Sequence, residues 1–487
     1  MPGPPKKVAI VVTHGMGEQI PMETLRGFVE AAWVANKAAQ WPATPADEKA
    51  EDIWFMPDGA AGSLELRRIT TRWTKPQASS TERGPRADFF EFYWADLAEG
   101  TTVEEVWDWI QILLLRWPSQ VPNGLMGIWI ALWAASAIIL IVSALALSPW
   151  PGGWWHAVFA IAAAGFGYIM KRLISPYLGD VARYVRADPR NIAMRHAIRE
   201  RGLKLLQDLH DTKSYERIIM VAHSLGSIIA YDLVSLFWAT RRDALVVHEE
   251  DDPVFQKLRA VETAAHSLAA ATDANRVDLM QAYREAQRSL RLAMRSGGED
   301  GTGRPREPTE EWLISDLVTL GSPLTHAPFL LARDAKDLSD KIGDWLFPTN
   351  CPQFQVIQTE QSRKIHDRPA PPPTAAVLGP PQGLFSYFLR PPKTWSLHHA
   401  APFAAVRWTN IYDTHRPILR GDIISGPLAP VFGAGIRDID LKDLRGQSPV
   451  FSHTLYWALA PGGGPMPHID ALRKAIDLPD TPDSALW

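Results

Sequence analysis

The chain has 487 residues and a formal net charge of −4, and charged residues make up 21% of it. Such a near-neutral balance provides no electrostatic footprint for nucleic acid, so we expect no nucleic-acid partner. The length excludes a mini-protein and is that of roughly three domains, or of one large domain with insertions. The single cysteine, Cys351, excludes an intramolecular disulfide.

Charge is absent from one long stretch of the sequence. The 54 residues between Arg116 and Lys171 contain no Lys, Arg, Asp or Glu, where the overall composition predicts about eleven. Apolar runs at Leu125–Leu147 and Trp154–Met170 flank a turn rich in Pro and Gly, which predicts a two-helix transmembrane hairpin. The basic flanks place both halves of the chain in the cytoplasm, beside a bilayer that we expect to be a bacterial-type inner membrane. The alternatives are a hairpin buried in a soluble core and a hairpin that dips into one leaflet.

Outside this stretch, short apolar runs alternate with amphipathic segments. Strands are predicted at Val8–Val12, Leu64–Thr71, Phe89–Tyr93, Arg217–Ala222, Leu313–Leu320 and Ala404–Tyr412. Helical segments are predicted at Val103–Leu115, Arg183–Leu209, Ser227–Trp238, Val254–Arg295 and Ile469–Ile476. Strands that alternate with helices are typical of an α/β fold, in which helices flank a mostly parallel sheet.

The segment Ile218–Asp232 holds the first candidate for chemistry. Its sequence, IIMVAHSLGSIIAYD, predicts a strand, a sharp turn and a helix, with Ser224 at the turn. Small residues at Ala222 and Gly226 permit a tight backbone, and the N-terminus of the helix favours negative charge that develops beside the serine. The segment resembles the nucleophile elbow of the α/β-hydrolase superfamily in its lipase-like Gly-His-Ser-Leu-Gly form, although Ala222 stands where the first Gly usually stands. The resemblance implies an α/β-hydrolase fold and a serine hydrolase of the lipase or esterase type.

The resemblance also implies a catalytic triad whose members follow one another as serine, acid and histidine. Beyond the candidate acids, His453 and His468 remain as bases, and we favour His453 because its segment, FSHTLYW, resembles the histidine segment of lipase-like hydrolases. Two acids stay open. Asp422 lies in GDIISGP, which is similar to the acid segment of several lipase-like families, and we favour it over Asp413, which follows a predicted strand.

An oxyanion hole needs two backbone N–H donors aimed at one oxygen. One donor is expected at Leu225, directly after the serine. The other is expected at Met16, because His14–Gly17 follows the first strand and resembles the His-Gly-x-Gly loop of lipases and esterases.

These assignments divide the chain into five segments. The hydrolase domain takes 1–116, then 173–240 with the nucleophile, and finally 311–487 with the acid and the histidine. The transmembrane hairpin takes 117–172, and a helical, cap-like insertion takes 241–310 and is a lid candidate. The arginines of this insertion either contact anionic lipid or form a solvated face; they are Arg276, Arg284, Arg288, Arg291 and Arg295. No metal or nucleotide motif occurs, so we expect no cofactor and no metal.

The expected activity is that of a membrane-anchored serine hydrolase that cleaves a carboxylic ester, with a lipid or another acyl ester as its substrate. An acyltransferase or a thioesterase would use the same triad. A catalytically silent hydrolase fold that serves as a membrane scaffold is the alternative from another class, because a fold alone does not determine a function.

Overall fold

The computed structural model describes most of the chain in segments. The described residues are 7–15, 20–41, 53–57, 66–75, 83–98, isolated positions within 117–161, 184–185, 189–241, 253–295, 311–350, 385–389, 394–414, 421–422, 424–441, 452–460 and 466–486.

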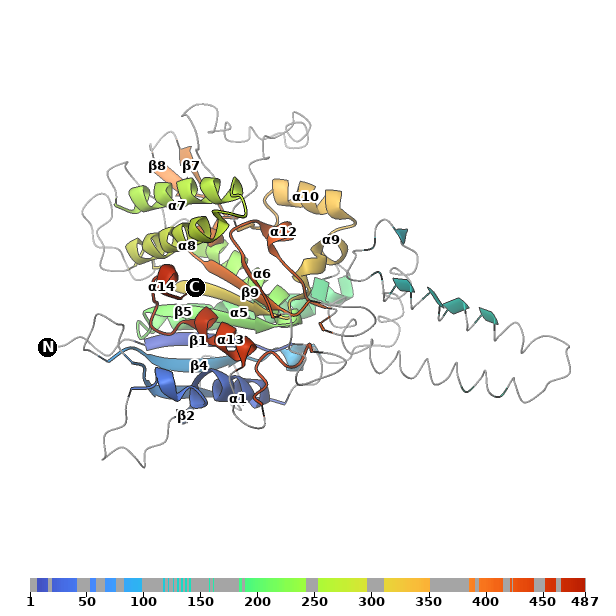
Figure 1. The fold of residues 1–487 in the computed structure, drawn as a ribbon, viewed down its shortest axis with the longest axis horizontal. Helices are drawn as coiled ribbons and strands as arrows, with labels where there is room; N and C mark the ends of the chain where they lie inside the picture. The colour runs from blue at the N-terminus through green and yellow to red at the C-terminus, as the bar shows by residue number, and fades with distance from the viewer. Residues whose placement is uncertain are drawn as a thin grey trace, which may run out of the picture.

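A mixed sheet of eight strands forms the centre of the molecule (Figure 1). In spatial order its strands are β10 (Arg437–Asp440), β9 (Arg407–Tyr412), β6 (Ile314–Leu320), β5 (Arg217–His223), β1 (Lys7–Thr13), β4 (Arg86–Phe92), β3 (Arg67–Trp73) and β2 (Ile53–Pro57). The strands from β10 to β4 are parallel, whereas β3 and β2 are antiparallel to their neighbours. A separate hairpin joins β7 (Ser386–Leu389) and β8 (Thr394–Leu397).

The two central strands, β1 and β5, are apolar on both faces. Their sequences, KVAIVVT and RIIMVAH, are buried almost throughout, as expected for parallel strands that helices cover on both sides. The register pairs Thr13 with Ala222, so the two strands end at the same level. Chain connections leave these two strands in opposite directions across the sheet, and such a switch point is where open α/β sheets hold their ligand sites.

Helices cover both faces of the sheet (Figure 1). The longer ones are α1 (Glu23–Val29), α5 (Pro189–Asp211), α6 (Leu225–Arg241), α7 (Pro253–Ala269), α8 (Arg276–Ala293), α10 (Ala335–Gly343) and α13 (Pro467–Ile476), and the shorter ones are α9 (Ala327–Leu330), α12 (Ala429–Phe432) and α14 (Asp483–Leu486). One apolar core joins the sheet to α5, α6, α7 and α8, and a second core joins its other face to α1 and α13. The result is a three-layer α/β arrangement.

The segment predicted as one long helix at Val254–Arg295 is two helices, α7 and α8, packed against each other. The turn between them is held by the side chain of Asn275, which accepts the N–H of Thr272 at 2.8 Å. Helix-forming residues on both sides of this turn conceal the break in the sequence pattern.

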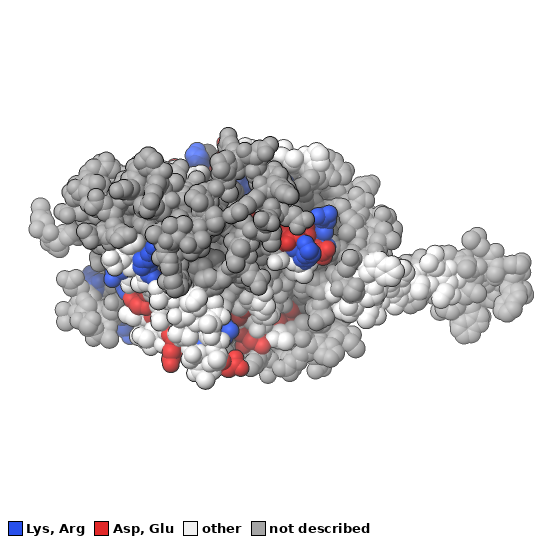
Figure 2. All heavy atoms as spheres, turned by 90° about the horizontal axis from the view of Figure 1, so that it is seen from above, with Lys and Arg blue, Asp and Glu red and all other residues white. Residues whose placement is uncertain are grey.

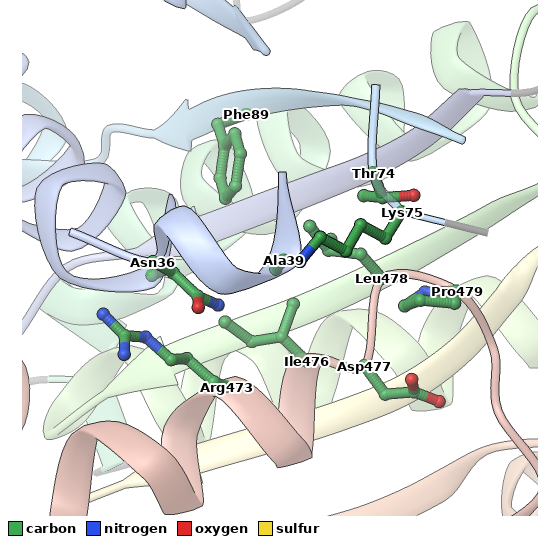
Figure 3. A pocket seen from close by; sticks show the side chains of 11 residues that line it. Asn36, Ala39, Thr74, Lys75, Phe89, Arg473, Ile476, Asp477, Leu478 and Pro479 are labelled. Carbon is green, nitrogen blue, oxygen red and sulfur yellow. The ribbon is translucent and has the colours of Figure 1, made fainter. Parts of the chain in front are cut away.

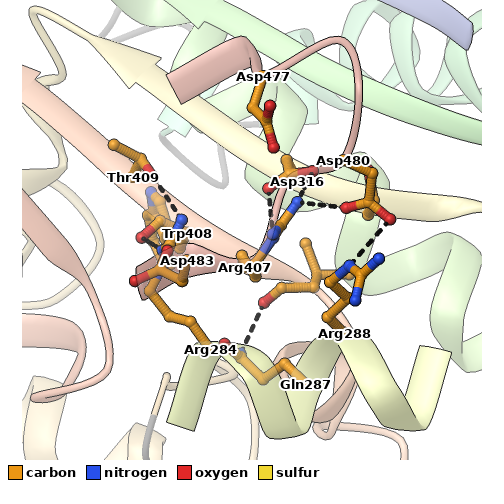
Figure 4. A network of polar contacts seen from close by, with 12 residues as sticks. Arg284, Gln287, Arg288, Asp316, Arg407, Trp408, Thr409, Asp477, Asp480 and Asp483 are labelled. Carbon is orange, nitrogen blue, oxygen red and sulfur yellow. Dashed lines mark hydrogen bonds and ion pairs between the residues drawn. The ribbon is translucent and has the colours of Figure 1, made fainter. Parts of the chain in front are cut away.

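Arg284, Arg288 and Arg291 of α8 face the body of the protein (Figure 4), whereas Arg276 at the start of the helix is exposed. Arg284 pairs with Asp483 at 2.8 Å, and Arg291 pairs with Asp480 at 2.6 Å. Both partners belong to the C-terminal segment, so this basic stripe holds the chain end against the sheet.

The fold class expected from the sequence included a transmembrane hairpin at 117–172, and this part of the expectation is corrected. Nothing within the described ranges combines the length and the apolar composition of a helix that crosses a bilayer. Most of 117–172 lies outside the described residues. The expectation relied on the lack of charge and on two apolar runs, Leu125–Leu147 and Trp154–Met170, that flank a turn rich in Pro and Gly. The α/β arrangement stands without that hairpin.

Charges of both signs occur among the described residues on the face shown in Figure 2. Blue and red atoms lie close to one another there, in keeping with the net charge of −4.

Candidate active site

Ser224 lies at the sharp turn between β5 and α6. β5 ends at His223 and α6 begins at Leu225, so the turn contains one residue. Ser224 has φ = 52°, a left-handed conformation that non-glycine residues rarely adopt. Its N–H donates to the carbonyl oxygen of Leu320 at the end of β6 (3.0 Å), and its own carbonyl accepts the hydroxyl of Ser227 (2.6 Å). These contacts hold a strained backbone in place, as is common at functional sites.

The side chains of Ser224, His453 and Asp422 form a continuous hydrogen-bonded chain. His453 Nε2 lies 2.8 Å from Ser224 Oγ, and His453 Nδ1 lies 2.9 Å from Asp422 Oδ2. In the neutral imidazole, Nδ1–H donates to the carboxylate, and Nε2 accepts the hydroxyl proton of the serine. All three side chains are buried, with at most 1% exposure.

The environment of Asp422 keeps its carboxyl group ionised. Burial by itself would raise the pKa of Asp422, but the charge of His453 and hydrogen bonds from His453, Tyr456 and the Ile424 amide outweigh it and lower the pKa. The Ile424 N–H donates to Oδ1 at 2.9 Å. A carboxylate that stays charged can stabilise a positive charge on the neighbouring imidazole.

The alternative acid and the alternative base occupy other positions. The carboxylate of Asp413 accepts the hydroxyl of Ser452 at 2.7 Å, and its carbonyl oxygen accepts the N–H of Asp422 at 3.4 Å. His468 lies in the first turn of α13, where its Nε2 contacts the carbonyl oxygen of Ala458 at 2.9 Å. The structure therefore brings Asp422 and His453 to Ser224. Asp413 instead contacts Ser452, the residue before His453.

Of the two expected oxyanion donors, Leu225 is described and Met16 is not. Leu225 is the first residue of α6, so its N–H lies at the positive end of that helix directly after Ser224. Met16 lies outside the described residues, but the loop that carries it begins within them. A Cβ added to Gly15 would lie 3.0 Å from the Cβ of Ser224 and 2.9 Å from His223 Nδ1. The loop after β1 therefore passes directly against the serine, and only glycine fits at this approach.

His14 fixes the start of this loop. Its ring stacks on Trp94 with centroids 4.9 Å apart, its Nε2 accepts the N–H of Trp94 (3.1 Å), and its Nδ1 donates to the carbonyl of Gly15 (2.8 Å). Burial lowers the pKa of His14 to about 4. His14 is thus a neutral ring whose two nitrogens are both engaged in holding the loop.

Three neighbours of the triad were not predicted from the sequence. His223 Nε2 contacts the carbonyl oxygen of His453 at 2.7 Å, and the Tyr456 hydroxyl donates to Asp422 Oδ2 at 2.7 Å. Gly321, with φ = 60°, lies so close to the pair that an added Cβ would be 3.1 Å from Asp422 Oδ2 and 3.2 Å from His453 Cε1. The glycine that follows a buried strand was a usable signal, whereas nothing local marks His223 or Tyr456.

A pocket of about 170 Å³ lies elsewhere in the molecule (Figure 3). Phe89 and Ile476 form part of its apolar wall, and Lys75, Asn36 and Arg473 bring polar groups to it. Asp477 also lines it, and its carbonyl oxygen accepts a hydrogen bond from Arg217 at the beginning of β5, one strand length away from Ser224. This pocket is therefore separate from the hydrogen-bonded chain of Ser224.

Two further findings concern metal sites and similar proteins. Within the described ranges, no group of three or more His, Cys, Asp or Glu side chains could hold a metal ion. The chain matches no protein-family model, no curated protein and no solved structure.

Proposed function

We propose that this protein is a serine hydrolase of the α/β-hydrolase type that cleaves a carboxylic ester through an acyl-enzyme. The observation that supports the proposal is the buried chain from Ser224 Oγ through His453 to Asp422, with separations of 2.8 and 2.9 Å. A serine hydroxyl is a weak nucleophile until a base takes its proton, and the base needs a third group to orient it. Each of these roles has one residue at hydrogen-bonding distance.

The reaction begins when Ser224 Oγ attacks the carbonyl carbon of the ester while its proton passes to His453 Nε2. The carbonyl oxygen becomes an oxyanion beside the N–H of Leu225, at the N-terminus of α6. The carbon–oxygen bond to the leaving group then breaks, and the alcohol takes the proton from Nε2. Water repeats these steps on the acyl-enzyme and releases the acid. Asp422 remains ionised throughout and holds the imidazole through Nδ1–H.

The first test is covalent labelling with a fluorophosphonate probe, which reacts with an activated serine hydroxyl. Wild-type protein is expected to be labelled, and Ser224→Ala and His453→Ala are expected to lose the label. Ser235→Ala is a matched control, because this serine lies on the same helix and its hydroxyl donates to the carbonyl of Tyr231. His468→Ala is the control for the second histidine, and both controls should keep the label.

Labelling that survives Ser224→Ala would contradict the proposal and assign the reactive hydroxyl to another residue. A folded wild-type protein that is never labelled would contradict it and favour a silent scaffold. Once labelling is established, p-nitrophenyl esters of increasing acyl length measure turnover and identify the acyl group that the site accepts. Acyl transfer to an alcohol or a thiol in place of water would identify an acyltransferase, which shares the first half of the reaction.

A further inference from the structure

Tyr456 makes a third side-chain contact with the acid of the candidate triad. Its hydroxyl lies 2.7 Å from Asp422 Oδ2, the same oxygen that His453 Nδ1 approaches at 2.9 Å. The hydroxyl also lies 3.0 Å from Ser425 Oγ. Tyr456 is only 1% exposed, so water does not replace any of these partners easily.

The direction of each hydrogen bond follows from the ionised carboxylate, which can only accept. Tyr456 must donate its one proton to Asp422, so the contact with Ser425 requires the serine hydroxyl to donate to the tyrosine oxygen. Burial, followed by the charge of Asp422, raises the pKa of Tyr456 well above its ordinary value. The phenol therefore remains a donor across the whole working range of pH.

Two donors on one oxygen compete for the same negative charge. The Tyr456 proton draws charge from Oδ2, which weakens the hold of that oxygen on a positively charged imidazole. A chain from Ser425 through Tyr456 to Asp422 also polarises each of its bonds in the same direction. The hydroxyl of Tyr456 thus moderates how strongly Asp422 favours the protonated form of His453.

We propose that Tyr456 is a positioning residue that sets the basicity of the His453–Asp422 pair by sharing Asp422 Oδ2 with the imidazole. The inference rests on the proposed function, in which His453 must be neutral to accept the proton of Ser224. Tyr456 thereby joins the three proposed triad residues as a fourth member, and it acts on them only through Asp422.

Other titratable groups near the pair come from separate elements. His223, at the end of β5, has its ring centroid 4.8 Å from that of His453, and burial followed by the charge of His453 lowers the pKa of His223 to about 3. Asp413, after β9, contacts the hydroxyl of Ser452 beside His453. The proximity of His14 also lowers the pKa of His223. None of these hydrogen bonds and ring contacts includes the hydroxyl of Tyr456, so Tyr456→Phe removes only the hydrogen bonds of that hydroxyl to Asp422 and Ser425.

The test is Tyr456→Phe, which removes one oxygen and keeps the ring. The acid limb of the pH profile of kcat/KM is expected to move to higher pH by about one unit, since a hydrogen bond to a charged group is of that size. Ser425→Ala should move the limb in the same direction by a smaller amount. Tyr231→Phe is the matched control, because this buried tyrosine donates to the carbonyl of Pro348 away from the site, and its limb should stay in place.

A purely structural role for Tyr456 predicts a different result. Activity would then fall by the same factor at every pH, with the acid limb unmoved, and this outcome would overturn the inference. If Tyr456→Phe does not fold, the shift of the acid limb in Ser425→Ala still tests the inference.

A second readout does not depend on turnover. The Nδ1–H of His453, which donates to a buried carboxylate, should give a low-field proton resonance that is lost in His453→Ala. This resonance is expected to move further downfield in Tyr456→Phe and to stay unchanged in Tyr231→Phe. An unmoved resonance in Tyr456→Phe contradicts the inference about Tyr456, whereas a wild-type protein that shows the resonance but reacts with no probe contradicts the proposed function.

Discussion

His223 donates its Nε2 proton to the main-chain carbonyl of His453 across 2.7 Å, so the residue before the proposed nucleophile supports the backbone of the proposed base. We call this hydrogen bond the His223 brace. Trp457 packs edge-on against the His223 ring, with the two ring centroids 4.9 Å apart. The contact links the end of β5 to the loop that presents His453. The low pKa of His223 keeps its ring neutral, so the brace is the same throughout the neutral range.

His223→Ala removes this brace and leaves a buried carbonyl without its donor. We expect kcat/KM to fall about tenfold and the free energy of unfolding to fall by about 1–3 kcal/mol. Because the brace does not titrate, the ratio of variant to wild-type kcat/KM should be constant from about pH 5 to 9. A ratio that changes steadily with pH would show instead that the charge of His223 contributes.

Gly321→Ala introduces a methyl group where the triad leaves no room for it. The added Cβ would lie 2.7 Å from Tyr456 Cε2 and 3.1 Å from Asp422 Oδ2, at a residue with φ = 60°. Displacement of the Asp422–His453 pair should lower kcat/KM about 100-fold. Gly343→Ala is the control, because a Cβ at Gly343 has nothing within 4 Å. Equal activity of the two variants would mean that the site tolerates displacement.

Asp422→Asn and Asp413→Asn separate the two candidate acids. An amide at 422 can hold the imidazole in the wrong tautomer and carries no charge, so kcat should fall about 10⁴-fold. An amide oxygen at 413 can still accept the hydroxyl of Ser452, so kcat should change less than about tenfold. Ester turnover measured under saturating substrate gives both values, and the reverse order would transfer the acid role to Asp413.

Glu91 makes stability depend on pH near neutrality. Burial raises the pKa of its carboxyl from 4.5 to about 7, although the N–H groups of Met22 and Leu25 lower it in part. Below about pH 4.5 the group is protonated in both states. As pH rises towards 7 the unfolded chain loses its proton first, so the free energy of unfolding should fall by about 3 kcal/mol.

Glu91→Gln should remove this fall and make the protein more stable than wild type at pH 8. Urea unfolding at a series of pH values measures the difference between the two proteins. Glu30→Gln replaces an exposed carboxyl nearby and should keep the wild-type dependence. Parallel curves for wild type and Glu91→Gln would show that Glu91 does not titrate in this range.

Asp480 is the shared counter-charge of several buried arginines (Figure 4). It lies 2.6 Å from Arg291, 3.0 Å from Arg407 and 3.5 Å from Arg217. Asp480→Asn leaves these cations short of a partner, so the free energy of unfolding should fall by about 3–5 kcal/mol. Asp340→Asn is the control. Asp340 forms an exposed pair with Lys336, and its loss should leave the urea midpoint unchanged.

The position of Ser224 was predictable because strand, turn and helix lie within fifteen consecutive residues. The choice between Asp413 and Asp422 depended on resemblance, since both follow β9 and only the path of the later loop separates them. The position of Gly321 after a buried strand was a local signal that was not used, whereas His223 and Tyr456 were missed because each acts through contacts that local pattern does not encode. Their partners lie as far as 230 positions away in the chain.

Composition was a weaker guide than local pattern. The lack of charge between Arg116 and Lys171, together with two apolar runs inside it, led to the prediction of a transmembrane hairpin, and no described helix can span a membrane. The edge strands β2 and β10 were also missed. β2 is mostly exposed and β10 is the charged sequence RDID, so neither shows the apolar pattern of an interior strand.

The contact between Ser224 and His453 joins residues 229 positions apart. The chain between them includes β6 and β9 of the central sheet, and each closure of a long loop costs chain entropy. The hydrogen bond therefore depends on long-range closure of the chain, and local structure alone does not make it. Its presence identifies a chain whose topology is complete.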